Sequence, residues 1–113
     1  MSLKIKAGGS LHPTSKDTLD KGWHNIDQDG KTVFRYAVSE MSTVTREIMK
    51  RNELDNESID YLVPHQANKR IVDATTKRLD LNPSKVMMNI EYYGNTTAAT
   101  LPLLLKDYEK KLK

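Results

Sequence analysis

Two polar side chains in this sequence stand where each could bind a developing negative charge. His65 follows Pro64, which ends an apolar run, Tyr61 to Val63, that predicts a short buried strand. Asn95 follows a second apolar run, Val86 to Ile90, and a glycine that permits a tight turn. An imidazole N–H and a carboxamide N–H that point to one place form an oxyanion hole for a thioester carbonyl. The residue types therefore indicate acyl-transfer chemistry.

The two residues can act together only if the two predicted strands are neighbours. The residues between them predict a helix, and parallel strands joined by one crossover helix end at the same edge of a sheet, where open α/β sheets bind their ligands. We therefore expect His65 and Asn95 to lie close together. Each also has a more ordinary interpretation. His65 is then a polar residue satisfied by hydrogen bonds, and Asn95 or Thr96 caps the helix that follows.

Apolar residues at spacings of three and four predict three helices. The first runs from about Thr32 to Arg51, the second follows His65 and ends near Asp80, and the third begins at Thr96. Pro102 lies inside the third helix, where it should remove one backbone hydrogen bond and bend the helix. The expected inward-facing residues are Val33, Ala37, Met41, Val44 and Ile48 in the first helix, Ile71, Ala74, Thr75 and Leu79 in the second, and Leu101, Leu104, Leu105, Tyr108 and Leu112 in the third.

The amino-terminal part is less regular. Leu3 to Lys6 alternates apolar and polar residues, as a half-exposed strand does. Residues 11–29 are polar and rich in turn formers, which predicts an irregular loop, with Trp23 as its large aromatic side chain. The sequence as a whole predicts an α/β fold with a short mixed sheet of about three strands and three helices.

Composition excludes several kinds of chemistry. The 113 residues contain no cysteine, so disulfides, thiolate metal sites and a cysteine nucleophile are excluded within this chain. His12 and His24 have no metal-ligand spacing around them, and we expect no metal site. A net charge of +3 permits an anionic partner without demanding nucleic acid. No apolar run approaches the ~20 residues that span a bilayer, and no signal peptide is evident, so we expect a cytoplasmic location without membrane association.

Both motifs together resemble one family. The segment Val63 to Asn68 and the segment Tyr93 to Ala99 closely resemble β-ketoacyl-acyl-carrier-protein synthase III, a thiolase-like condensing enzyme that starts fatty acid synthesis. The resemblance runs from about Ile5 to Leu105 and implies the carboxyl-terminal half of the family fold. It also implies that His65 and Asn95 hold the malonyl thioester oxygen. Acyl-CoA and malonyl-carrier protein would be the substrates, with no cofactor.

Other residues acquire roles only through this resemblance. The loop that contains Trp23 would help to wall the pantetheine tunnel, although Trp23 can equally be a local anchor. The residues that would contact the pantetheine arm or line its tunnel are Gly30, Phe34, Ala37 and Asn68. The residues that would dock the acidic acyl carrier protein are Arg35, Arg70, Lys77 and Arg78. Core packing for Phe34, helix capping for Asn68 and simple solvation for the basic residues remain open.

The family's condensation uses a cysteine in its amino-terminal half, which this sequence does not match. We therefore expect residues 1–113 to be a single carboxyl-terminal fragment, with Met1 to about Lys4 partly vector-derived, inactive without the missing amino-terminal half. The family's whole enzymes are homodimers, and we expect the same of the complete protein. The main alternative is a non-catalytic module that binds CoA or acyl carrier protein. A small nucleic-acid-binding domain ranks last because aromatic residues make up only 6% of the chain.

Overall fold

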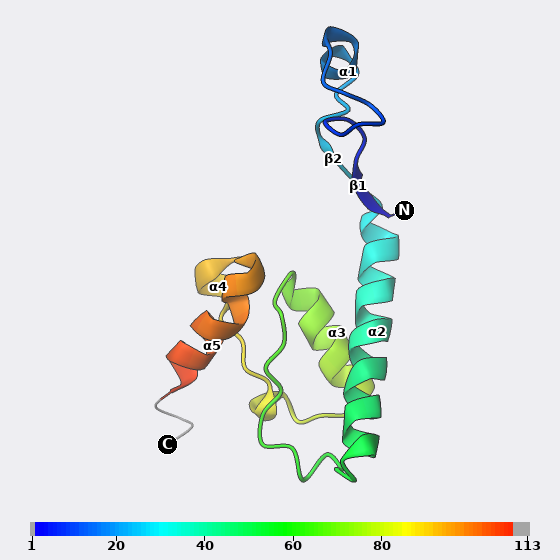
Figure 1. Ribbon diagram of the computed structural model, residues 1–113. Coiled ribbons are helices and arrows are strands. Elements are labelled where there is room, and N and C mark those ends of the chain that lie inside the picture. The colour runs from blue at the N-terminus through cyan, green and yellow to red at the C-terminus, as the bar shows by residue number, and fades with distance from the viewer. Residues whose placement is uncertain (1, 110–113) are drawn as a thin grey trace. The chain divides into compact units, whose positions relative to one another are not determined.

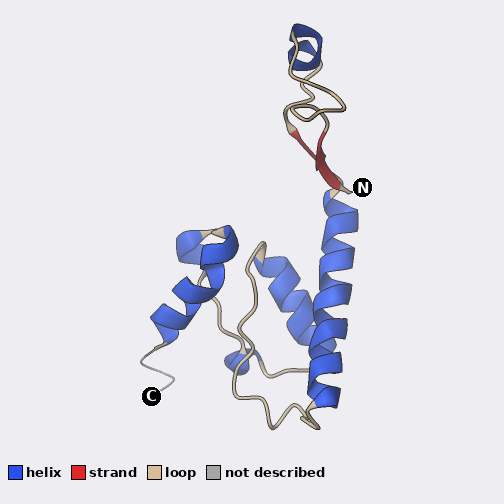
Figure 2. Ribbon diagram, viewed as in Figure 1, coloured by secondary structure: helices blue, strands red, loops and turns tan. Residues whose placement is uncertain are grey.

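The computed structural model describes residues 2–109, so the expectations for Met1, Leu112 and the last part of the tail lie outside the described residues. The chain forms two compact units, Met1–Tyr36 and Ala37–Lys113. Figures 1 and 2 show the elements of each unit. The fold is α/β, as predicted, but the three-stranded mixed sheet was wrong. In residues 2–109 there is a two-stranded antiparallel sheet and, separately, one isolated parallel bridge.

The sheet belongs to the first unit. Strand β1 (Leu3–Ile5) was predicted, and it pairs with β2 (Ile26–Gln28), which was not. The carboxylate of Asp27 on β2 lies 3.1 Å from the Lys6 ammonium and 3.9 Å from that of Lys4. These ion pairs hold two exposed strands in register, where little apolar area is available to do so.

The loop predicted over residues 11–29 is more ordered than expected. It contains the short helix α1 (Lys16–Asp20), which begins with a capping box between Ser15 and Thr18. The carbonyl oxygen of Trp23 accepts hydrogen bonds from the amides of Lys6 and Ala7, both at 3.1 Å. The indole also meets the His12 ring edge to face, with the ring centroids 5.2 Å apart. Trp23 therefore serves as the local anchor of this unit.

Helix α2 (Gly30–Arg51) begins two residues before the predicted helix. Its first turn is held by Asp29, whose carboxylate accepts from the amide and the hydroxyl of Thr32 at 3.1 and 2.7 Å. The predicted apolar face was wrong in part: Val33, Ala37 and Met41 are half-buried, but Val44 and Ile48 are 56% and 51% exposed. The residues of α2 that are buried instead are Val38, Ser42 and Met49. The small Ser42 satisfies its own hydroxyl on the carbonyl of Val38 at 2.7 Å, so a polar residue can occupy the packed face.

Helix α3 (Lys69–Leu79) packs beside α2, as Figure 1 shows, and the Arg46 guanidinium donates to the carbonyl of Arg78. Its predicted inward face was largely right: Ile71, Thr75 and Leu79 are buried, while Ala74 is half-buried. The fully buried Val72 was not predicted. Helix α3 thus contributes Ile71, Val72 and Leu79 to the apolar core of this unit.

The two predicted central strands reduce to the bridge between Leu62 and Val86, which is parallel as expected. The amide of Leu62 donates to the carbonyl of Lys85 at 2.8 Å, and the amide of Met87 donates to the carbonyl of Leu62 at 3.0 Å. The next ladder bond would need an N–H from Pro64, which has none. In the other direction the amide of Lys85 is already used by Asn82, in the turn η1 (Pro83–Lys85). Both extensions of the ladder are therefore blocked.

The remaining elements are α4 (Ile90–Tyr93), the 3₁₀ turn η2 (Thr97–Ala99) and α5 (Thr100–Tyr108). Ile90, predicted as the end of a strand, instead starts α4. The bend expected at Pro102 was wrong, because α5 begins only at Thr100. Pro102 then lies in the first turn, where a backbone N–H has no intrahelical partner anyway. Leu104 is fully buried, whereas Leu101 and Leu105 are 42% and 46% exposed.

Candidate active site

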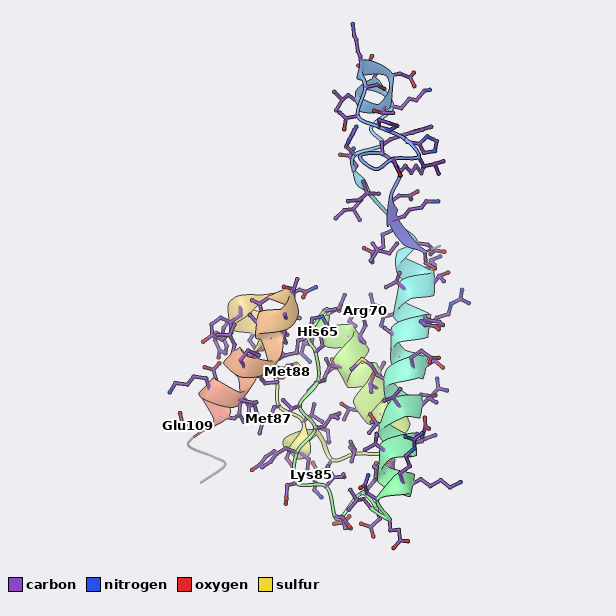
Figure 3. All side chains as sticks on the ribbon, viewed as in Figure 1. His65, Arg70, Lys85, Met87, Met88 and Glu109 are labelled. Carbon is purple, nitrogen blue, oxygen red and sulfur yellow. The ribbon has the colours of Figure 1, made fainter. Side chains whose placement is uncertain are left out.

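His65 lies in the loop that leads from the parallel bridge into α3 (Figure 3). The proline before it is buried and the glutamine after it is completely buried, while His65 itself is exposed. Within residues 2–109 neither ring nitrogen makes a hydrogen bond. The interpretation of His65 as a polar residue satisfied inside the fold therefore has no support from the described residues.

Asn95 lies in the turn between α4 and η2. Its Oδ1 atom accepts from the amide of Thr97 at 3.1 Å, which leaves the Nδ2 group without a partner among the described residues. This contact fixes the amide orientation, so that the donor end is the end that remains available. Thr97 has a φ of 51°, in the left-handed region that β-branched residues rarely adopt. Asn95 thus stabilises its local turn and still offers a donor, whereas the predicted capping of the following helix by Asn95 or Thr96 was wrong, because neither η2 nor α5 has a side-chain cap.

The two motifs are joined by the buried side chain of Gln66. Its Oε1 atom accepts from the amides of Asn89 and Ile90, both at 2.9 Å, and its Nε2 atom donates to Oδ1 of Asn89 at 2.9 Å. Gln66 and Asn89 are 0% and 5% exposed. Because buried polar groups stabilise a fold only when they are hydrogen-bonded, this pairing fixes the His65 loop against the start of α4.

The network continues to α5. The Nδ2 group of Asn89 donates to Oδ2 of Asp107 at 2.8 Å, and the Tyr93 hydroxyl donates to Oδ1 of the same carboxylate at 3.3 Å. The negative charge of Asp107 raises the pKa of the Tyr93 hydroxyl. The Tyr108 hydroxyl is also bonded to Met88, 3.4 Å from its amide and 3.3 Å from its carbonyl. Helix α5 is therefore tied to both sides of Asn89.

The predicted binding residues of the second unit are Ala37, Asn68, Arg70, Lys77 and Arg78. Asn68 caps α3, since its Oδ1 atom accepts from the amide of Arg70 at 2.9 Å. The capping interpretation is thus confirmed, while the pantetheine contact stays a prediction. The three basic residues are exposed along α3, and Ala37 is half-buried on α2.

The other predicted binding residues belong to the first unit. Gly30 is the first residue of α2, and a Cβ added there would meet nothing within 4 Å. Phe34 is half-buried and Arg35 is exposed. The absence of crowding at Gly30 within the described structure means that packing does not require a glycine there. The roles of these residues toward a substrate remain predictions.

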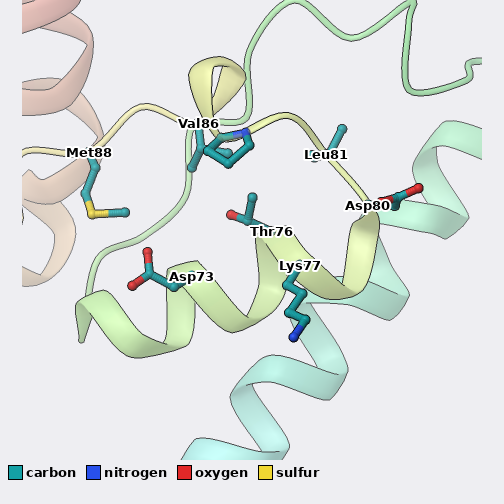
Figure 4. A pocket seen from close by; sticks show the side chains of 8 residues that line it. Asp73, Thr76, Lys77, Asp80, Leu81, Val86 and Met88 are labelled. Atoms are coloured by element: carbon teal, nitrogen blue, oxygen red, sulfur yellow. The ribbon is translucent and has the colours of Figure 1, made fainter.

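A cleft of about 370 Å³ lies between α3 and the segment that contains Val86 and Met88 (Figure 4). Asp73, Thr76 and Lys77 line it from the helix side. It does not include His65 or Asn95. No group of three or more His, Asp or Glu side chains in residues 2–109 could hold a metal ion. None of the described helices has the length and apolar character needed to cross a membrane.

The structure thus brings together the segments that carry His65 and Asn95, through Gln66 and Asn89, while the convergence of the two donors themselves stays a prediction. Sequence reasoning missed Gln66, Asn89 and Asp107. The available signal was Asn89, a polar residue at the end of an otherwise apolar run, which needs a partner if it is buried.

Comparison with known proteins defines the class first. The structure matches a crystal structure of a 3-oxoacyl-(acyl-carrier-protein) synthase III with a TM-score of 0.86 and 27% identity, over 97% of this chain and 35% of that one. The synthase III of Pseudomonas aeruginosa matches with a TM-score of 0.75 and 36% identity, over 88% of this chain and 29% of that one. The fold is therefore that of the thiolase-like condensing enzymes.

The family follows from sequence. Residues 49–113 match the family model described as 3-oxoacyl-[acyl-carrier-protein] synthase III C terminal. The β-ketoacyl-[acyl-carrier-protein] synthase III of Phocaeicola vulgatus is 54% identical over 111 residues, 98% of this chain and 33% of that protein. The chain belongs to the carboxyl-terminal family of 3-oxoacyl-[acyl-carrier-protein] synthase III, and it spans about a third of the length of the curated relatives it matches. The predicted family resemblance is confirmed.

Proposed function

We propose that this chain is the carboxyl-terminal part of a synthase that condenses an acyl-CoA primer with malonyl-acyl-carrier protein, and that His65 and Asn95 are its oxyanion donors. One observation carries the proposal: in a chain of this family, the His65 ring and the Asn95 Nδ2 group belong to the two motifs that the Gln66–Asn89 pair joins, and both are without a partner in residues 2–109. Both side chains are exposed, so a ligand can reach them.

The proposed chemistry needs no cofactor. A cysteine outside this chain carries the primer as a thioester. Loss of carbon dioxide from the malonyl group breaks a carbon–carbon bond, and the electron pair moves into an enolate whose oxygen bears the charge. His65 and Asn95 each donate a hydrogen bond to that oxygen. The enolate carbon then attacks the primer carbonyl, and the cysteine thiolate leaves.

Donor geometry supports Asn95 in this role. The hydrogen bond from the Thr97 amide to Oδ1 favours the carboxamide orientation that presents Nδ2, the donor, to the oxyanion. The His65 imidazole can donate through a ring N–H in the same way. Preorganised donors of this kind are each worth ~2.7–4 kcal/mol in the transition state, or roughly 10²–10³ in rate.

The test uses the complete synthase that contains this chain. His65→Ala and Asn95→Ala should each lower malonyl-thioester decarboxylation by about 10²–10³, while acylation of the cysteine by acyl-CoA continues. Lys50→Ala is the control, since Lys50 is exposed in the last turn of α2 and has no proposed role. Decarboxylation at the unaltered rate in both donor variants would refute the assignment. The 113-residue chain by itself should give no β-ketoacyl product, because it has no cysteine.

Carrier-protein docking is the second part of the proposal. Arg35, Arg70, Lys77 and Arg78 would contact the acidic carrier, and Gly30, Phe34, Ala37 and Asn68 would contact the pantetheine arm. Lys77→Glu should then raise KM for malonyl-carrier protein and leave KM for malonyl-CoA unchanged, and the effect should weaken with salt. An equal change in both KM values would argue against docking at α3.

A further inference from the structure

We infer that Gln66 is a positioning residue: through the chain Gln66–Asn89–Asp107 it fixes the loop of His65 relative to the helix that leads to Asn95. This inference rests on the proposed function for its catalytic meaning, but the coupling itself is a property of the described structure. Nothing in the family match assigns a role to these three side chains.

Gln66 is completely buried, yet it follows an exposed histidine directly, so its side chain points away from the proposed reaction site into the fold. There its Oε1 atom receives two backbone amides, those of Asn89 and Ile90, both at 2.9 Å. Ile90 is the first residue of α4, and Asn89 makes no side-chain cap of its own. Gln66 therefore caps this helix from a distant segment.

The backbone links Ile90 to Asn95 through one short helix. Helix α4 spans only Ile90–Tyr93, and Gly94 follows it with its amide bonded to the carbonyl of Ile90 at 2.8 Å. Asn95 comes next, held at its acceptor end by Thr97. A shift of Ile90 is therefore passed to Asn95 through one short, hydrogen-bonded turn. Because Gln66 and His65 are adjacent, the same side chain sets both donors.

The hydrogen bonds between Gln66, Asn89 and Asp107 have a fixed donor-to-acceptor direction. The Asp107 carboxylate can only accept, so it orients the Asn89 amide with Nδ2 toward α5 and Oδ1 toward Gln66. The Gln66 amide must then donate to Asn89 through Nε2, which leaves Oε1 for the two backbone amides. Each orientation determines the next. Asp107 therefore sets the direction of the whole chain of hydrogen bonds.

Substitutions at positions 66 and 107 can reverse the direction of these hydrogen bonds. Gln66→Glu has nearly the same shape but places a carboxylate oxygen against Oδ1 of Asn89, and Asp107 prevents Asn89 from turning around. In the double variant Gln66→Glu with Asp107→Asn, Asn89 can turn, donate to Glu at position 66 and accept from Asn at position 107. Asp107→Asn alone should be mild, because its amide oxygen can still accept. A residue that only fills space would not distinguish these variants.

The first measurement uses the isotope-labelled complete synthase that contains this chain. Gln66→Glu should shift the Asn95 side-chain amide signals and speed hydrogen exchange at the Ile90 amide at least tenfold, and the double variant should reverse most of both changes. The control is Gln28→Glu, at an exposed position of β2. Unmoved Asn95 signals in Gln66→Glu, or no recovery in the double variant, would overturn the inference.

If Gln66→Glu fails to fold, the single variant Asn89→Asp replaces it. The double variant Asn89→Asp with Asp107→Asn then tests for recovery, at a side chain that lies one hydrogen bond closer to the surface. Asp at position 89 opposes Asp107, and Asn at position 107 relieves the opposition. The same two signals are followed, and recovery in the pair is again the expected result. Failure to recover would overturn the inference here as well.

The second measurement is kinetic, on the complete synthase. Gln66→Glu should lower kcat for malonyl-thioester decarboxylation at least tenfold with little change in KM, and the double variant should recover most of it. An unchanged kcat in Gln66→Glu overturns the positioning role if His65→Ala is slow. If His65→Ala is also unchanged, the proposed function has failed, and the signals of the labelled synthase still decide whether Gln66 sets the position of Asn95.

Discussion

Residue 97 shows how much strain the Asn95 turn contains. Thr97 has a φ of 51°, although left-handed backbone costs an L-residue roughly 1–2 kcal/mol and β-branching makes it rarer still. The amide of Thr97 is the group that orients Asn95. Strained residues of this kind persist where the surrounding structure determines them, and they are frequent in active sites.

Thr97→Gly should therefore stabilise the fold. Glycine adopts positive φ freely, and after subtracting its extra entropy loss of roughly 0.5–1 kcal/mol from the relieved strain of roughly 1–2 kcal/mol, the net gain should be at most about 1.5 kcal/mol. A thermal melt should therefore show a rise of a few degrees, at roughly 4–8 °C per kcal/mol for a domain of this size. The neighbouring Thr96 has a φ of −92°, so Thr96→Gly is the matched control and should lower the melting temperature. A drop in both variants would mean that Thr97 is not strained.

Among the elements, α3 depends on its two caps. Asn68 caps the start, and Asn56 donates to the carbonyls of Leu79 and Asp80 at the end, at 3.1 and 3.0 Å. Asn68→Ala should cost about 0.5–2 kcal/mol of unfolding free energy, measured by urea denaturation. Asn68→Ser retains a capping oxygen and should cost much less. Equal losses in the two variants would contradict the capping role.

Strand pairing in the first unit should depend on pH through Asp27. The Lys6 ammonium lowers the pKa of this carboxylate, chiefly through their hydrogen bond, with a smaller contribution from Lys4. A pKa lower in the folded state means that the ion pair contributes stability above the unfolded value of ~3.9, and that this contribution disappears as pH falls through the folded value. The β1 amide signals should therefore shift in that acidic range.

The matched variant for this titration is Asp27→Asn, which should lose the acidic transition at β1, whereas Asp60→Asn should retain it. Asp60 is exposed and makes no ion pair in residues 2–109. Added salt should also weaken the effect of Asp27, because the pair is solvent-exposed. Identical titrations of β1 in the two variants would contradict the assignment.

The same elements show how far sequence can predict this structure. Helices α2 and α3 follow from apolar spacing, and the parallel relation of Leu62 to Val86 follows from the crossover helix between them. The strands were overestimated because the apolar pattern does not reveal where hydrogen-bond donors are lacking, as at Pro64, or already used, as at Lys85. The buried face of α2 was wrong in part because Ser42 packs as well as an apolar residue once its hydroxyl is bonded locally.

In the candidate site, too, some residues could be predicted from the sequence and others could not. His65 and Asn95 could be found because their residue types and their positions after apolar runs are visible in the chain. Gln66 could not, since a glutamine between a histidine and an alanine has the composition of a surface loop. The burial of Gln66 becomes evident only from its hydrogen bond to Asn89, which lies 23 residues further along the chain. Long-range polar pairing has no periodic signature in sequence.

At the scale of the whole molecule, exposed apolar side chains are numerous. Val44 and Ile48 on α2 are 56% and 51% exposed, Leu105 on α5 is 46% exposed, and Tyr92 is 80% exposed. The segments around Leu62 and Val86 have one ladder contact with each other and no other strand partner among the described residues. Apolar strand segments of this type require covering layers and paired edges.

We therefore expect the 113-residue chain to self-associate or to be only marginally stable. Light scattering should show species larger than a monomer at high concentration, and a thermal melt should be broad or low. Val44→Lys with Ile48→Lys should shift the chain toward the monomer, because both replacements put charge on the exposed apolar face of α2. Thr43→Lys also adds a lysine to α2, but at a position that is already exposed and polar. This control should not shift the chain toward the monomer. A monodisperse monomer with cooperative unfolding above ~65 °C, the upper end of the range for mesophilic domains, would show that the chain closes its own core.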